Sequence, residues 1–193
     1  MARKKYEFKP DSTGSGVLSK LYLTQKQRKS MLKWTLYTLV CLVLLILQDV
    51  LMSRVRIFGA TTDLVSCAIL LICVIQGPES GGLFALLGSV IFLFSGSAPG
   101  PFTIVFLTVY GILAGIFRQG YLRKGLSSMV FCAFGALVLY EVSVFVIAAF
   151  VGHTTWERFP CYLLTAVYSL VFMPVLYLIF RSIGKIGGET WKE

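Results

Sequence analysis

Long apolar runs separated by short polar segments make up most of the chain after residue 30. The apolar residues of each run are continuous rather than alternating, which is typical of helices inside a membrane. We therefore predict an all-α, polytopic transmembrane bundle of about six helices. Its helices are expected at 31–52, 61–76, 81–95, 101–118, 126–151 and 160–181.

Polar segments flank this helical domain of residues 31–181. Residues 1–30 form a basic tail and residues 182–193 a shorter one, and both are predicted to be cytoplasmic. Of the 18 Lys and Arg residues, only Arg54, Arg56 and Arg158 fall on the outer side in this topology. Positive charge marks the cytoplasmic side of a membrane protein, so both termini are predicted to lie inside.

The overall composition supports a membrane protein and argues against a soluble domain and against a nucleic-acid-binding protein. The mean hydropathy is +0.80 and only 14% of the residues are charged, against about 25% in a soluble domain. The net charge of +9 lies mainly in the tails and links, which argues against nucleic-acid binding. The five cysteines form no CxxC pair and are read as small packing residues.

The second and third predicted helices are shorter than the others. Sixteen residues at about 1.5 Å each span about 24 Å, less than the roughly 30 Å of a hydrocarbon core. Two explanations stay open for this pair: the bilayer thins locally, or the two helices form a re-entrant hairpin.

Glu141 is the most informative single residue, because it lies near the middle of the apolar run 126–151. A charge at that depth costs about 2.5–3.5 kcal/mol on insertion scales. Three roles stay open: a hydrogen bond inside the bundle, with Tyr110 or Tyr168 as candidate donors; a contact to a partner subunit; or ligand or ion binding.

Two further groups of residues are candidates for packing or docking. Small side chains recur every four residues and permit close helix contact, either inside the bundle or with another chain; they are Gly81, Ala85, Ser89, Gly111 and Gly115. Charged residues cluster around the outer link between the first two helices, as interfacial ion pairs or a docking surface; they are Asp49, Arg54, Arg56 and Asp63.

Motifs of enzyme active sites are missing from the sequence. His153 is the single histidine and falls in an outer link, where a solvated role is the simplest interpretation. The chain has no GxSxG, HExxH or P-loop motif. We expect a protein that is not an enzyme and that uses no cofactor or metal.

The middle of the chain resembles a known family. Leu47-Gln48-Asp49, then Arg54 to Gly59 (RVRIFG) and Thr62-Asp63-Leu64, are similar to the start of MreD, the rod shape-determining membrane protein of bacteria. The Gly/Pro turn at 76–80, the Gly-rich run after it and the YGILAG stretch ending at Arg118 are similar as well. The resemblance covers about residues 45–120. One departure is the stretch Phe92–Phe94, where MreD sequences often have an acidic residue.

The resemblance implies a non-catalytic scaffold of the bacterial cell-elongation machinery that makes peptidoglycan. It implies docking to MreC, to RodA with its penicillin-binding transpeptidase and to the MreB cytoskeleton, in a cytoplasmic membrane with anionic lipids. The lipid-facing sides of the third and fourth helices are the expected docking surface for MreC. It also implies a fold similar to the S component of energy-coupling-factor transporters. The alternative function is therefore the substrate-binding subunit of a vitamin or ion transporter.

Overall fold

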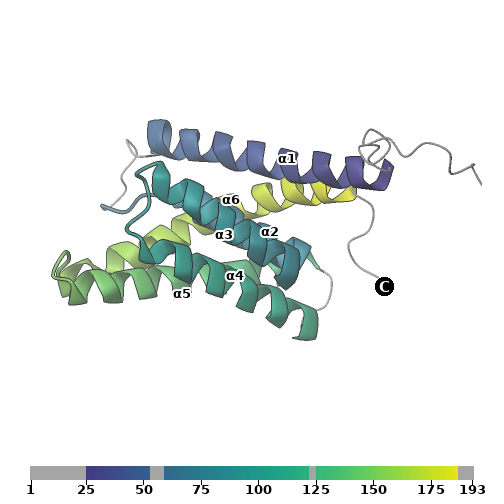
Figure 1. Ribbon diagram of the computed structural model, residues 1–193. Helices are drawn as coiled ribbons and strands as arrows, with labels where there is room; N and C mark the ends of the chain where they lie inside the picture. Colours follow the sequence, from purple (N-terminus) through teal and green to yellow (C-terminus); the bar gives the residue numbers. More distant parts are fainter. Residues whose placement is uncertain (1–24, 53–58, 122–124, 187–193) are drawn as a thin grey trace, which may run out of the picture.

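The computed structural model describes residues 25–52, 59–121 and 125–186, which are mainly helical (Figure 1). In chain order the elements are α1 (Gln25–Leu47), the π-helical turn η2 (Gln48–Met52), α2 (Leu64–Gln76), α3 (Pro78–Phe94), α4 (Phe102–Tyr121), α5 (Leu126–Phe150), the 3-10 turn η3 (Trp156–Arg158) and α6 (Phe159–Ile186). The predicted all-α bundle of six helices is confirmed. Most of the predicted basic tail, residues 1–24, lies outside the described residues.

Four helical stretches are long and apolar enough to cross a membrane. They are Arg28–Val50, Phe102–Gly120, Leu126–Phe150 and Trp156–Ile186. Their outward-facing side chains are largely apolar, as expected for surfaces that face lipid. The architecture is therefore that of a membrane protein.

The short helix α2 is the centre of the bundle. All of its 13 residues are buried, and α1, α3, α4, α5 and α6 all pack against it. Thirteen residues span only about 20 Å. A helix enclosed by protein on every side does not have to match the thickness of the lipid, which accounts for the length of α2 without thinning of the bilayer.

The turn between α2 and α3 is tighter than predicted. Gly77 adopts φ 92°, a conformation that glycine accepts at little cost, and α3 begins directly at Pro78 rather than at residue 81. Proline suits this first helical position because its fixed φ is already helical and its missing N–H has no partner to lose. The two helices therefore form a close antiparallel hairpin (Figure 1).

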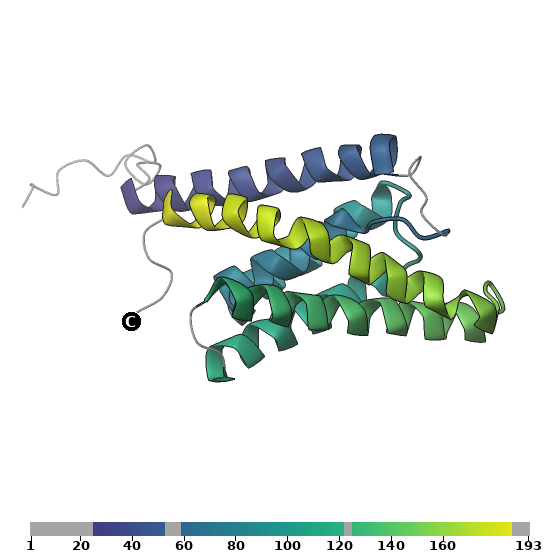
Figure 2. The ribbon, with the colours of Figure 1, turned by 180° about the vertical axis from the view of Figure 1, so that it is seen from behind.

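The beginning of α1 and the finish of α6 lie at the same end of the bundle (Figures 1 and 2). We call this the proximal end, and the opposite one, where α2 begins, the distal end. Seen from behind, α6 runs diagonally from α1 at the proximal end to α5 at the distal end (Figure 2). Helix α1 packs mainly on α6 and α2 and touches α3 much less.

Candidate functional site

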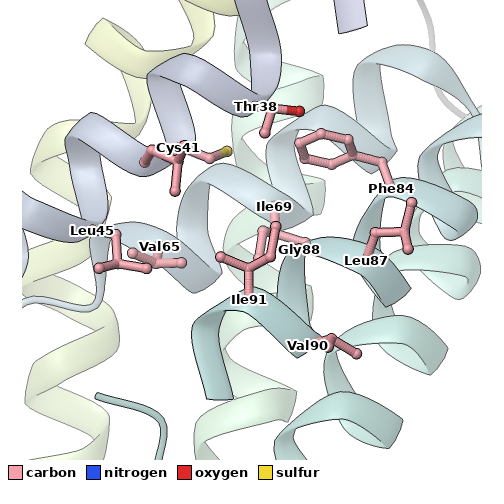
Figure 3. Close-up of a pocket in the computed structure, with 11 residues that line it drawn as sticks. Thr38, Cys41, Leu45, Val65, Ile69, Phe84, Leu87, Gly88, Val90 and Ile91 are labelled. Carbon is pink, nitrogen blue, oxygen red and sulfur yellow. The ribbon is translucent and has the colours of Figure 1, made fainter. Parts of the chain in front are cut away.

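An apolar groove opens between α1 and α3, with α2 as its floor (Figure 3). Its volume is about 330 Å³, and its lining is almost entirely hydrocarbon. The side chains that define it include Cys41 and Leu45 from α1, Ile69 from α2, and Phe84, Leu87 and Ile91 from α3.

The groove forms where α1 and α3 make few contacts with each other. Gly88 lies on α3 facing the groove, and a Cβ built on it would lie 3.2 Å from the Ile69 side chain. Leu42 and Leu87 stand at the rim and are 43% and 56% exposed. In a bilayer this opening faces the apolar phase, so it accepts hydrocarbon chains or apolar side chains.

A second, polar cleft of about 560 Å³ lies at the distal end. The link before α2, the link after α3, α5 and the start of α6 all contribute to it. We call it the distal cleft; its polar lining includes Gln48, Thr62, Asp63, Glu141, Arg158 and Tyr162. The cleft brings Glu141 and Asp63 together, two acids that are 78 positions apart in the sequence.

Glu141 is 5% exposed and lines this cleft. Within the described part of the chain, no hydrogen-bond donor reaches its carboxylate. The candidate partners from sequence lie elsewhere: the Tyr110 hydroxyl is 2.5 Å from the Ser143 hydroxyl, and Tyr168 makes no hydrogen bond to Glu141. The proposed hydrogen bond inside the bundle is therefore not formed with either tyrosine.

Asp63 holds the beginning of α2 in place. Its carboxylate accepts a hydrogen bond of 3.0 Å from the Ser66 N–H, as an N-cap does. Its own N–H donates to the Ser169 hydroxyl at 3.0 Å, and the Val65 N–H donates to the Gln48 side chain at 3.0 Å. Burial raises the pKa of the Asp63 carboxyl above its ordinary value, although the hydrogen bond from Ser66 opposes the effect.

A basic side chain binds the C-terminal end of α2. The Arg118 guanidinium, from the end of α4, donates to the carbonyls of Val74 and Ile75 in the last turn. Those carbonyls have no partner within the helix, and the negative end of the helix dipole favours a cation there. Sequence reasoning placed Arg118 only in a cytoplasmic link, although a basic residue ending an apolar helix is a usable signal for this role.

Lys33 adds a second buried cation at the proximal end. Its ammonium donates to the Gln76 side chain at 2.9 Å and lies 5.2 Å from the centre of the Trp34 ring. The Gln76 amide donates to the Tyr37 hydroxyl at 2.6 Å, and that hydroxyl donates to the Phe180 carbonyl at 3.1 Å. This network joins α1, α2 and α6.

The five small residues singled out in the sequence lie at contacts inside the bundle. Gly81 faces the Cys73 backbone, where an added Cβ would be 2.6 Å from the Cys73 Cα. Gly111 faces Cys73 as well, and a Cβ added to Gly115 would lie 2.9 Å from the Pro78 nitrogen. Ala85 and Ser89 are fully buried in α3, so this face packs α2, α3 and α4 together.

The structure describes two of the four charged residues that were predicted to cluster at the first outer link, Asp49 and Asp63. Asp63 is buried as the N-cap of α2, and Asp49 is hydrogen-bonded to the Ser97 hydroxyl of the link after α3. Arg54 and Arg56 lie outside the described residues. The two acids thus belong to different contacts within the distal end.

The structure also gives the positions of the remaining residues that the sequence analysis discussed. His153 lies in the exposed turn after α5. Across residues 25–52, 59–121 and 125–186, no group of three or more His, Cys, Asp and Glu side chains has a metal-binding arrangement. Phe92, where the MreD resemblance suggests an acidic residue nearby, is buried and lines the distal cleft.

Comparison of the chain with protein-family models, with characterised proteins and with solved structures finds no match.

Proposed function

We propose that this protein is a non-catalytic scaffold in a bacterial cytoplasmic membrane that receives a single transmembrane helix of a partner. The groove between α1 and α3 is the observation that carries the proposal. In lipid, helices associate mainly through close packing, because the lipid is as apolar as their side chains. An apolar groove of this kind provides such packing for a partner's helix.

The similarity of residues 45–120 to MreD supports a partner of the MreC type, a single-pass protein with a large outer domain. The proposed complex would further include RodA with its penicillin-binding transpeptidase and the MreB cytoskeleton. The sequence-based expectation gave α3 and α4 as the docking surface. The groove favours α3 together with α1, because that is where the surface is hollowed.

The proposed orientation has both termini in the cytoplasm. Two observations support it: basic residues dominate the tails, and α1 begins at the same end of the bundle as α6 finishes. In this orientation the distal end faces outward, where the large domain of an MreC-like partner would lie.

The distal cleft favours a second candidate function, the substrate-binding subunit of a small-molecule transporter. Such a subunit needs polar side chains that converge on a pocket, and Asp63 and Glu141 do so. The two candidates differ in their partner: a single-pass protein for the scaffold, and a membrane subunit with paired ATPases for the transporter.

Site-specific photocrosslinking in native membranes tests the scaffold. A benzophenone amino acid replaces Leu87 at the rim of the groove in one variant, and Val171 in the other. Val171 is a matched control because it is also exposed, at 70%, but lies on α6 away from the groove. We expect the Leu87 variant to capture a single-pass protein and the Val171 variant not to capture it.

Two outcomes would count against this proposal. Equal capture of the same protein at both positions would mean that the groove has no special role. Capture of a transporter membrane subunit at Leu87 would replace the scaffold by the second candidate.

A further inference from the structure

The distal cleft contains a buried acid that accepts no hydrogen bond from the described residues. Glu141 lies on α5, nine residues before the helix ends at Phe150, which puts it about 13 Å along the axis from that end. It is 5% exposed, and in the described part of the chain nothing donates a hydrogen bond to it. Burying an acid in this way is costly unless something compensates for it.

A second acid and a hydroxyl increase that cost. Asp63 lines the same cleft and is close enough to Glu141 for their negative charges to repel each other. The Thr62 hydroxyl oxygen is buried, and it has no hydrogen-bond partner among the described residues. A ligand that carries positive charge and N–H donors would balance the charge of both acids and could donate hydrogen bonds to Glu141 and to the Thr62 hydroxyl.

The size and lining of the cleft narrow the class of ligand. Its volume of about 560 Å³ is within the roughly 300–1,000 Å³ of small-molecule sites and far larger than a bare ion needs. Phe92, Pro99 and Tyr162 add apolar and aromatic surface. Aromatic rings attract organic cations as well as their hydrocarbon parts.

Arg158 is the one basic residue among the side chains that line the cleft in the described structure, and it is exposed. It lies in η3, just before α6, whereas Glu141 is buried within α5. The exposed position of Arg158 leaves the buried part of the cleft with acidic and neutral groups.

We propose that the distal cleft binds a small organic ammonium compound, whose charged nitrogen lies between Glu141 and Asp63 and whose hydrocarbon part contacts Phe92 and Tyr162. This inference goes beyond the scaffold proposal and does not depend on it.

The test uses the purified full chain in detergent and four probes: methylammonium, butylammonium, benzylammonium and putrescine. Binding is measured by isothermal titration calorimetry and by the shift in thermal unfolding temperature. We expect at least one probe to bind saturably. Its dissociation constant should rise about tenfold or more in Glu141→Gln, because a charge-assisted hydrogen bond is lost.

Three controls keep the result specific. Glu79→Gln removes an exposed acid at the opposite, proximal end and should leave the dissociation constant unchanged. The unfolding temperature of Glu141→Gln without a probe shows whether that variant folds. Butanol and benzyl alcohol, which match two probes in shape but lack the charge, should not bind.

The proposal is overturned if none of the four probes binds, if an alcohol binds as well as its amine, or if Glu141→Gln binds as tightly as the unchanged protein. None of these results bears on crosslinking at Leu87, so the scaffold proposal would stand or fail separately.

Discussion

The buried charged side chains at the two ends of α2 differ in their hydrogen bonding. At the proximal end, Arg118 and Lys33 are buried beside the helix C-terminus, and both donate hydrogen bonds there. At the distal end, Asp63 caps the helix, but Glu141 lies beside it in a polar cleft with no donor among the described residues.

This difference indicates that the charged groups at the two ends of α2 have different roles. A buried charge that is fully hydrogen-bonded helps to fix one arrangement of the helices, and its removal leaves carbonyls without partners. A buried charge without a partner costs free energy unless protonation or a bound group neutralises it. We therefore expect the charged groups at the proximal end to contribute to stability, and the proposed ligand binding to depend on the distal end.

The largest expected effect is at Arg118. Replacing it with leucine removes the guanidinium that donates to the Val74 and Ile75 carbonyls at the end of α2 and should lower the free energy of unfolding by about 3 kcal/mol. Equilibrium unfolding in mixed micelles measures this. Arg181→Leu, which removes an exposed arginine from α6, is the matched control and should change it by no more than about 0.5 kcal/mol. Equal losses of unfolding free energy in both variants would show that Arg118 contributes no more to stability than an exposed arginine.

The next effect concerns the close packing beside the proximal end. Gly81→Ala places a methyl group 2.6 Å from the Cys73 Cα, so the α2–α3 pair must move apart, at a cost of about 2 kcal/mol. Gly135→Ala is the control, because a Cβ there meets nothing within 4 Å, and it should be neutral or stabilising. The same unfolding assay compares the two, and a neutral Gly81→Ala would contradict the observed contact.

A smaller loss is expected at the distal cap. Asp63→Ala removes the hydrogen bond to the Ser66 N–H and should cost about 1 kcal/mol. Asp63→Asn keeps an oxygen that can accept this bond and should recover most of the loss. If asparagine is as destabilising as alanine, the charge of Asp63 matters more than its capping role.

The smallest effect is expected at Glu141. Glu141→Gln removes a buried charge that has no donor in the described structure, so the free energy of unfolding should stay within about 0.5 kcal/mol or rise. A loss of unfolding free energy near that expected for Arg118→Leu would contradict the proposed difference between the two ends, because it would show that Glu141 stabilises the fold as well.

The sequence predicts the helices well, since long apolar runs between Gly- and Pro-containing links have few other interpretations. It also identifies Glu141 as unusual from one carboxylate in an apolar run. It does not reveal that α2 is enclosed by the other helices, because a fully buried helix and a lipid-facing one have the same composition. The roles of Lys33 and Arg118 depend on which helix ends meet, and the pairing of Asp63 with Glu141 depends on contacts between distant segments. A basic residue at the end of an apolar helix is a local signal in the case of Arg118, but the helix end that it contacts cannot be read from the sequence, and Lys33, Asp63 and Glu141 leave no local pattern of their contacts.

The most direct test of the scaffold proposal is affinity purification of the tagged full chain from its native membranes in mild detergent, followed by mass spectrometry. We predict recovery of a single-pass membrane protein with a large outer domain, in an amount comparable to the tagged chain. Recovery of a transporter membrane subunit with paired ATPases, in place of such a protein, would contradict the account.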